Sequence, residues 1–207
     1  HASSSRRLIR DLTELLGKLR ADHPGQPTAL AGISWGGKLA VVTVATAPGL
    51  VDALALICPG LQPRVGVSRS EKLRIALAVL TNRRKRFPIP LADPALFTDH
   101  EAGRAFIASD PLGLREATAS LLAASTVLDL RVARAPRHIR QPVLLMLAGH
   151  DRIVDNARTL EYFRQLASVK KQVIEYPDCH HTLEFEPDPS RYALDLADWL
   201  EASLARR

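Results

Sequence analysis

The sequence predicts an α/β protein in which a mostly parallel sheet is covered by helices on both faces. Four short apolar runs alternate with stretches in which apolar residues recur at helical spacing. This alternation is typical of parallel strands joined by helices, because each helical crossover returns the chain to the same end of the sheet. A glycine-rich segment at residues 32–37, placed between a predicted strand and a predicted helix, supports the same architecture.

The elements follow one another in a regular order. Apolar side chains lie on one face of residues 8–19, after cap candidates at residues 3–5, and predict an opening helix. Continuous apolar runs, which suit strands buried on both faces, occur at residues 28–33, 51–58, 142–147 and 172–176. Further helices are predicted at residues 38–47, 157–168 and 190–204.

Residues 59–135 interrupt this alternation with several helical patterns and no clear central strand. In parallel sheets, ligands bind beyond the carboxyl ends of the strands, so an insertion at that edge covers the site. We therefore predict a core formed by residues 1–60 and 139–207, with residues 61–138 as an inserted helical lid.

Composition and charge narrow the functional classes. The 207 residues carry 28 Lys and Arg against 22 Asp and Glu, a net charge of +6. The strongest basic run, residues 83–86, is short and lacks interleaved aromatic side chains, which indicates a solvated helix end and no nucleic-acid partner. The alternative that this run draws the chain towards an anionic lipid surface stays open. Two cysteines are too few for a disulfide scaffold or a zinc cage and favour a cytoplasmic protein.

Residues 32–37 read GISWGG and carry the G-x-S-x-G spacing of a nucleophile elbow. In such an elbow Ser34 occupies a tight turn between a strand and a helix. Glycines flank it because a Cβ there would collide with the neighbouring strand and helix. The helix that follows directs backbone N–H groups towards developing negative charge.

A serine is a weak nucleophile and needs a base, which in turn needs an acid to orient it. Asp151 follows the third predicted strand, and Asp155 lies further on, at the expected cap of the next helix. His180 and His181 follow the fourth strand. Neighbours in an extended segment point to opposite sides, so one of the two histidines can meet the serine.

Three segments, GISWGG, LAGHDRIVD and YPDCHHTLEFE, resemble the signature segments of α/β-hydrolases of the monoacylglycerol lipase and lysophospholipase-like group. The resemblance implies the α/β-hydrolase fold with an inserted helical lid and a triad of Ser34, Asp151 and His181. In that group the base lies about five residues beyond the tyrosine that ends the last strand, which corresponds to His181. Two departures are Trp35, where methionine is common, and the additional histidine His180.

The resemblance further implies a carboxylic ester hydrolase that cleaves monoacylglycerol or lysophospholipid-like esters through an acyl-enzyme, without a metal or cofactor. A thioesterase, peptidase or acyltransferase would use the same triad, and a catalytically impaired binding protein on this fold is the alternative of another class. Leu73, Leu77 and Leu80 share one helical face in the lid, and we expect them to contact the acyl chain. The two cysteines, Cys58 and Cys179, are expected to act as small hydrophobic side chains, and His150 to bond locally.

Acyl transfer needs two donors for the oxyanion, and the backbone N–H of Trp35 is expected to be one of them. The group that the chain resembles supplies the second donor from a loop after an early strand. The first element recognised here is already the helix that leads into the elbow strand. We therefore expect these residues to form the carboxyl-terminal portion of a longer hydrolase, with the second donor upstream of His1.

Overall fold

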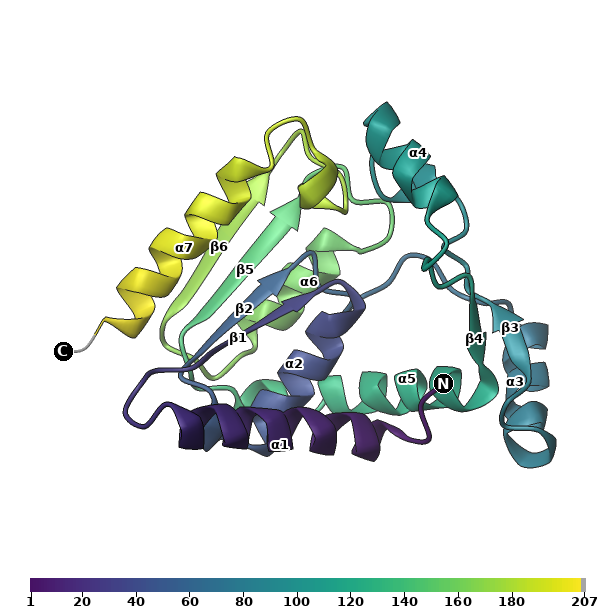
Figure 1. The fold of residues 1–207 in the computed structure, drawn as a ribbon, viewed down its shortest axis with the longest axis horizontal. Coiled ribbons are helices and arrows are strands. Elements are labelled where there is room, and N and C mark those ends of the chain that lie inside the picture. Colours follow the sequence, from purple (N-terminus) through teal and green to yellow (C-terminus); the bar gives the residue numbers. More distant parts are fainter. Residues whose placement is uncertain (206–207) are drawn as a thin grey trace.

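A parallel sheet of four strands forms the centre of the computed structural model, which describes residues 1–205 (Figure 1). The strands lie in the order β1 (Ala29–Ile33), β2 (Ala53–Ile57), β5 (Val143–Ala148) and β6 (Lys171–Tyr176). Each neighbouring pair is parallel. The four carboxyl ends therefore meet at one edge, and the loops that leave this edge can bring distant parts of the sequence together.

Seven α-helices accompany the sheet in the described residues. They are α1 (Ser5–Asp22), α2 (Trp35–Thr46), α3 (Arg69–Thr81), α4 (Glu101–Ser109), α5 (Ala119–Val132), α6 (Asn156–Arg164) and α7 (Ser190–Leu204). The cap predicted for α1 is Ser4, whose hydroxyl accepts from the N–H of Arg7 at 3.2 Å. In residues 1–205, no helix combines the length and the apolar character needed to cross a bilayer.

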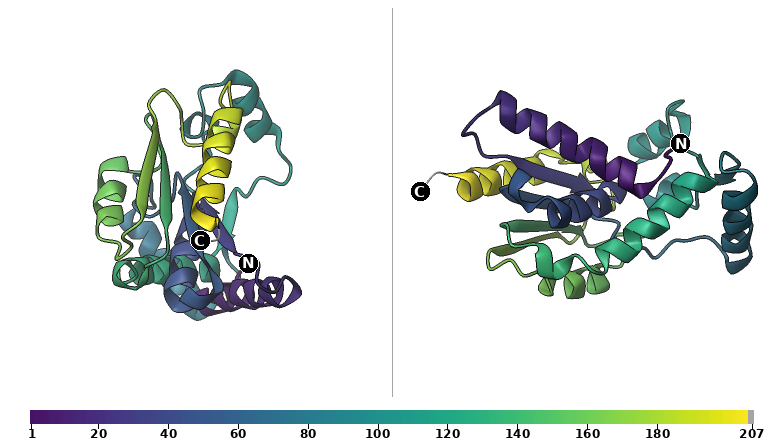
Figure 2. Two further views of the ribbon diagram at one scale, coloured as in Figure 1. Left: turned by 90° about the vertical axis from the view of Figure 1, so that its left-hand side faces the viewer. Right: turned by 90° about the horizontal axis from the view of Figure 1, so that it is seen from below.

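The two faces of the central strands β2 and β5 are buried under different helices. The prediction of burial on both faces is wrong for the outer strands β1 and β6, most of whose residues are half-buried or exposed, because each has a neighbouring strand on one side alone in the described residues. Leu54, Leu56 and Leu145 point into a core that is completed by α1, α2, α5 and α6. The alternate residues, such as Met146, pack against Trp199 of α7 on the opposite face. Figure 2 shows α6 and α7 on opposite sides of the strands. The predicted α/β-hydrolase architecture, a parallel sheet with helices on both faces, is confirmed.

The inserted segment, residues 61–138, has a much smaller core of its own. Ile75 and Ala78 of α3 pack with Phe87 and Ala119. The antiparallel strands β3 (Arg86–Pro88) and β4 (Glu116–Thr118) form a ribbon that the sequence does not indicate, because strands of three residues carry no periodic signal. Figure 1 shows this ribbon and α3 at the margin farthest from α7.

Helix α5 links the inserted segment to the main core. Its second half buries Leu128 and Val132 in the core under the sheet. Its first half lies nearer the ribbon, where Ala119 joins the small core of the inserted segment. The division at residue 138 stays a prediction about domains, since one helix serves both cores.

Candidate active site

Ser34 lies in a sharp turn between β1 and α2. Its backbone has φ 47° and ψ −121°, a conformation that a residue with a side chain adopts only at a cost. A Cβ on Gly32 would lie 2.8 Å from the Cβ of Ala40, and a Cβ on Gly37 would lie 2.6 Å from the Cβ of Pro59. Gly32 and Gly37 are therefore required by close packing, whereas a Cβ on Gly36, the second glycine of the motif, would meet no atom within 4 Å, so the predicted collision is wrong at that position. The turn at Ser34 between β1 and α2 has the geometry predicted for a nucleophile elbow.

Backbone hydrogen bonds hold the Ser34 turn from three sides. The N–H of Ser34 donates to the carbonyl of Ile57 at 3.0 Å. Its carbonyl accepts from the N–H of Gly37 at 3.0 Å and from the N–H of Gly60 at 2.7 Å. The position of the hydroxyl is thus set by main-chain contacts with β2 and with the loop that follows it.

Asp151 lies in the loop after β5 and is almost fully buried. Its Oδ1 accepts hydrogen bonds from the N–H groups of Ile153 and Val154, both at 2.8 Å. Its Oδ2 is left to face the ring of His181 at 2.8 Å. The alternative acid, Asp155, instead caps α6 by accepting from the N–H of Arg158 at 3.1 Å.

His181 connects Asp151 to Ser34. Its Nδ1 lies 2.8 Å from Asp151 Oδ2, and its Nε2 lies 2.8 Å from Ser34 Oγ. The imidazole is buried, and the ring of Phe97 meets it edge-on at 6.1 Å between ring centroids. The structure therefore brings together the three residues that the sequence suggested, in the hydrogen-bonded order acid, base and hydroxyl.

His180 points away from the serine, as expected for a neighbour of His181 in an extended segment. Its ring nitrogens lie 3.1 Å from Glu186 Oε1 and 2.9 Å from Asp99 Oδ2. The ring of His150 stacks on it, with 5.6 Å between the centroids. His180 is thus fully occupied outside the Ser34 hydrogen-bond chain.

The two free cysteines, Cys58 and Cys179, lie near the loops of the site, and their thiols are poorly suited to act as nucleophiles. Cys58 directly follows β2, has φ 40° and has no exposed surface. Burial raises the pKa of its thiol, and the nearby carboxylate of Asp151 raises it further. Burial also raises the pKa of Cys179. Because the thiolate is the reactive form, both cysteines are poor nucleophiles in this setting.

Trp35 is the first residue of α2 and contributes to the site in two ways. Its backbone N–H lies in the first turn, where the helix itself supplies no acceptor and the dipole favours negative charge. Its indole N–H donates to Ser125 Oγ of α5 at 3.0 Å. The tryptophan thereby connects the nucleophile elbow to the first half of α5.

Leu73, Leu77 and Leu80, predicted to contact an acyl chain, are not brought to Ser34. Their side chains lie on the outward face of α3 and are 72%, 61% and 84% exposed. The helix packs instead through Ile75 and Ala78, which form a separate stripe. Helical spacing identified an apolar face correctly, but it does not determine which face a neighbouring element covers.

Two residues near the site have no counterpart in the sequence predictions. Asp99, in the loop before α4, forms an ion pair with Arg152 at 2.8 Å. Arg152 directly follows Asp151 in the sequence, and this position is the feature from which its place near the site could have been predicted. The loop of Asp99 has neither periodicity nor a motif, so its position depends on long-range packing. Among residues 1–205, no cluster of His, Cys, Asp or Glu has the composition of a metal site.

The sequence as a whole matches a known family. A family model described as serine aminopeptidase, S33, covers residues 1–188. The chain belongs to this family. It is an α/β-hydrolase of the S33 family, and the predicted membership in the α/β-hydrolases is confirmed by a match that includes Ser34, Asp151 and His181.

Relatives within this group are ester hydrolases. The chain is 24% identical over 206 residues to a monoacylglycerol lipase of Mycolicibacterium smegmatis, covering 99% of this chain and 72% of that one. It is 25% identical over 179 residues to the monoglyceride lipase of Homo sapiens, covering 86% of this chain and 59% of that one. The chain thus spans roughly three fifths to three quarters of these relatives, whose names identify them as lipases of monoacylglycerols.

Solved structures support the fold assignment. The crystal structure of a monoacylglycerol lipase from Paleococcus ferrophilus superposes with a TM-score of 0.86 at 18% identity, covering 97% of this chain and 76% of that one. A soluble variant of the Saccharomyces cerevisiae monoglyceride lipase, in complex with a substrate analog, gives a TM-score of 0.79 at 19% identity, covering 97% and 69%. The S33 α/β-hydrolase is therefore similar in fold and sequence to carboxylic ester hydrolases.

Proposed function

We propose that this α/β-hydrolase cleaves carboxylic esters of the monoacylglycerol or lysophospholipid type through a Ser34–His181–Asp151 triad. The observation that carries the proposal is the unbroken chain of hydrogen bonds from Asp151 Oδ2 through the His181 ring to Ser34 Oγ, with two contacts of 2.8 Å. A serine becomes a useful nucleophile when a base of this kind accepts its proton.

In the first half-reaction, Ser34 Oγ attacks the ester carbonyl while His181 Nε2 accepts the hydroxyl proton. The carboxylate of Asp151 faces Nδ1, fixes the tautomer with Nε2 free, and stabilises the imidazolium that forms. Collapse of the tetrahedral intermediate breaks the bond to the leaving alcohol, which takes the proton from Nε2. The product of this step is an acyl ester on Ser34.

In the second half-reaction, His181 Nε2 accepts a proton from water, and the resulting hydroxide attacks the acyl-enzyme carbonyl. The bond to Ser34 Oγ breaks, the proton returns to the serine, and the fatty acid leaves. The two N–H groups that hold Asp151 Oδ1 keep its carboxylate in place through both steps.

Negative charge on the carbonyl oxygen needs donors that are already in position. We assign one of them to the backbone N–H of Trp35, because it lies at the amino end of α2 directly after the nucleophile. The helix dipole adds to this stabilisation. One such donor accounts for roughly 10²- to 10³-fold in turnover in comparable sites.

The substrate class is supported by the lipase relatives, whereas the family description favours a peptide substrate as the second candidate. Both reactions use one triad, so the choice depends on the substrate pocket. An ester is the easier acyl donor, since its alcohol is a better leaving group than an amine.

A direct test combines active-site labelling with graded substrates. We expect a fluorophosphonate probe to label the purified protein at Ser34 and to leave the Ser34→Ala variant unlabelled. Glycerol monoesters of increasing acyl length should then be hydrolysed faster than an aminoacyl p-nitroanilide. An unlabelled wild-type protein would favour a non-catalytic binding role, and preference for the anilide would favour the peptidase.

A further inference from the structure

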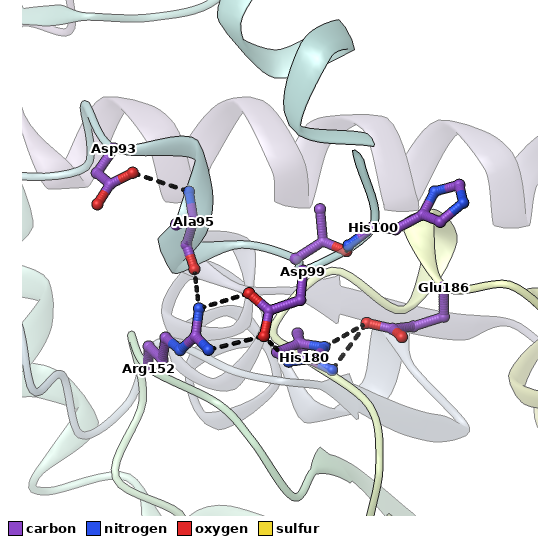
Figure 3. A network of polar contacts seen from close by, with 8 residues as sticks. Asp93, Ala95, Asp99, His100, Arg152, His180 and Glu186 are labelled. Atoms are coloured by element: carbon purple, nitrogen blue, oxygen red, sulfur yellow. Dashed lines mark hydrogen bonds and ion pairs between the residues drawn. The ribbon is translucent and has the colours of Figure 1, made fainter. Parts of the chain in front are cut away.

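The residues next to the triad acid and the triad base converge on a third loop. Arg152 follows Asp151, and His180 precedes His181. Both side chains bind the carboxylate of Asp99, which lies between β3 and α4 in the inserted segment. Together with Glu186 they form the Asp99 network, drawn in Figure 3.

The contact between Arg152 and Asp99 is bidentate. One guanidinium nitrogen donates to Oδ1 and the other to Oδ2, both at 2.8 Å. Arg152 also donates to the carbonyl of Ala95 at 2.6 Å. The hydrogen bond from Arg152 lowers the pKa of Asp99, and the neighbouring His180 lowers it as well. A planar fork of this kind fixes direction as well as distance, so the loop of Asp151 is held in one orientation relative to residues 93–100.

His180 completes the connection from the side of the base. Its Nε2 lies 2.9 Å from Asp99 Oδ2, and its Nδ1 lies 3.1 Å from Glu186 Oε1, which also accepts from the His180 backbone N–H at 2.8 Å. Both ring nitrogens of His180 thus face a carboxylate oxygen, one of Asp99 and one of Glu186.

A second set of contacts joins the loop of Asp99 to the loop of His181. The N–H of Thr182 donates to the carbonyl of Phe97 at 3.0 Å, and the Phe97 ring lies edge-on against His181. Three loops that are far apart in sequence thus meet at Asp99. The acid and base loops also contact each other directly, through the N–H of His150, which donates to the carbonyl of Cys179 at 2.9 Å, and the stacked His150 and His180 rings. The Asp99 carboxylate adds a contact from the inserted segment to both loops, through Arg152 and His180.

We propose that Asp99 is a positioning residue of the triad, which holds the loops of Asp151 and His181 in register through Arg152 and His180. This proposal rests on the proposed ester hydrolase function. Asp99 contacts none of the reacting atoms of Ser34, so it acts on the alignment of acid and base. Small errors in alignment are costly, since a displacement of about 1 Å can reduce turnover by roughly 10²-fold.

The exposure of the pair separates this role from a simple stabilising one. The side chains of Asp99 and Arg152 are 45% and 43% exposed. Ion pairs at this degree of exposure contribute little to the free energy of unfolding, because water and salt screen them. Loss of the carboxylate is therefore expected to leave the fold intact while it changes the triad.

The principal test is Asp99→Asn, which keeps the size of the side chain and removes its charge. With p-nitrophenyl butyrate as substrate, we expect kcat to fall about 10- to 100-fold with KM within about twofold of the wild-type value. The melting temperature should stay within about 4 °C. The matched control is Asp11→Asn, which removes one carboxylate from the exposed Arg7–Asp11 ion pair of α1 and should leave kcat unchanged.

A double-mutant cycle tests whether the network acts as one unit. Arg152→Gln alone should reduce kcat about as much as Asp99→Asn, and the double variant should lose little more than the worse single variant. Multiplying losses would mean that the two residues act independently and would overturn the proposal. Wild-type kcat in Asp99→Asn would overturn it too, as would a raised KM at unchanged kcat, which indicates substrate contact.

Two further arms keep the outcomes distinct. If Asp99→Asn fails to fold, His180→Gln replaces it, because the single amide nitrogen of glutamine cannot take the place of both ring nitrogens, which contact Asp99 and Glu186. Wild-type kcat in that variant would reject the positioning role. Fluorophosphonate labelling separates the two proposals. A wild-type protein that is not labelled at Ser34 refutes the hydrolase itself, whereas equal labelling rates in the wild type and Asp99→Asn refute only the role of Asp99.

Discussion

The central sheet and the inserted segment differ in how tightly they are built. Every residue of β2 and β5 is buried, and Gly149, directly after β5, has no room for a Cβ. In the inserted segment, α3 buries only Ile75 and Ala78, and α4 buries only Gly103. The polar Asp99 network and α5 connect this segment to the triad loops. The tightly packed region thus carries the three residues of the proposed triad, while α3 and α4 of the inserted segment bury few side chains.

Removing the reactive groups of the sheet loops tests the first half of this comparison and should give the largest effects. We expect Ser34→Ala and His181→Ala each to reduce kcat on a short-chain ester on the order of 10⁴-fold or more. The double variant should be no worse than either single variant, since both disable one nucleophilic unit. Steady-state hydrolysis of p-nitrophenyl butyrate measures all three.

The neighbouring histidine provides the contrast within the same loop. His180→Ala should reduce kcat no more than about 100-fold, because it acts on alignment and not on the proton. A loss as large as that of His181→Ala, with circular dichroism unchanged, would show that the base has been assigned to the wrong histidine.

The two aspartates after β5 are expected to separate chemistry from stability. Asp151→Asn should reduce kcat about 10⁴-fold, since an amide holds the wrong tautomer of His181. Asp155→Asn retains a side-chain oxygen that can cap α6, so both activity and unfolding free energy should change little. Steady-state kinetics and urea unfolding of the two variants would measure both effects. Substantial activity in Asp151→Asn would instead assign the role of the acid to Asp155.

Two glycines test the difference in packing between the regions. Gly149→Ala places a Cβ 2.2 Å from the carbonyl oxygen of Pro177, in the contact between the acid loop and the base loop. We expect a loss of about 3 kcal/mol in unfolding free energy, because backbone must move to make room. Gly66→Ala in the inserted segment has no atom within 4 Å of the new Cβ and should be nearly neutral. Equal effects in urea titrations would remove the distinction between the two regions.

The exposed leucines of α3 should give the smallest effect. Leu77→Ser removes an apolar side chain that is 61% exposed, so the unfolding free energy should change by no more than about 0.5 kcal/mol. Rates on butyrate and on palmitate esters should fall, if at all, by the same factor. A selective loss on the palmitate ester would restore the acyl contact that the sequence predicts for this face.

The sequence predicts the central sheet well because its signal is local. Strands such as Val143–Ala148 are continuous apolar runs, and the observed bounds differ from the predicted ones by a residue or two. The elbow could be found for the same reason, since its G-x-S-x-G spacing lies within residues 32–36, between a predicted strand and a predicted helix. Candidate acids and bases follow from their place at strand ends.

Other features depend on contacts that a linear pattern does not contain. The choice between His180 and His181 came from the family resemblance, because alternation states only that the two point apart. Asp99 could not be predicted, since its partners Arg152 and His180 lie far away in sequence. The apolar stripe of Leu77 was recognised, but its exposure depends on what the fold places beside α3.

The main-chain anchoring of Ser34 has a consequence for how such a protein diversifies. The turn is held by backbone groups of Ile57, Gly37 and Gly60, and none of these contacts depends on the side chains that flank the serine. Ile33 and Trp35, on either side of it, are 45% and 38% exposed. Substitutions at these two positions can therefore reshape the surroundings of the hydroxyl without displacing it. Natural variation can explore new substrates there while the reaction itself is inherited unchanged.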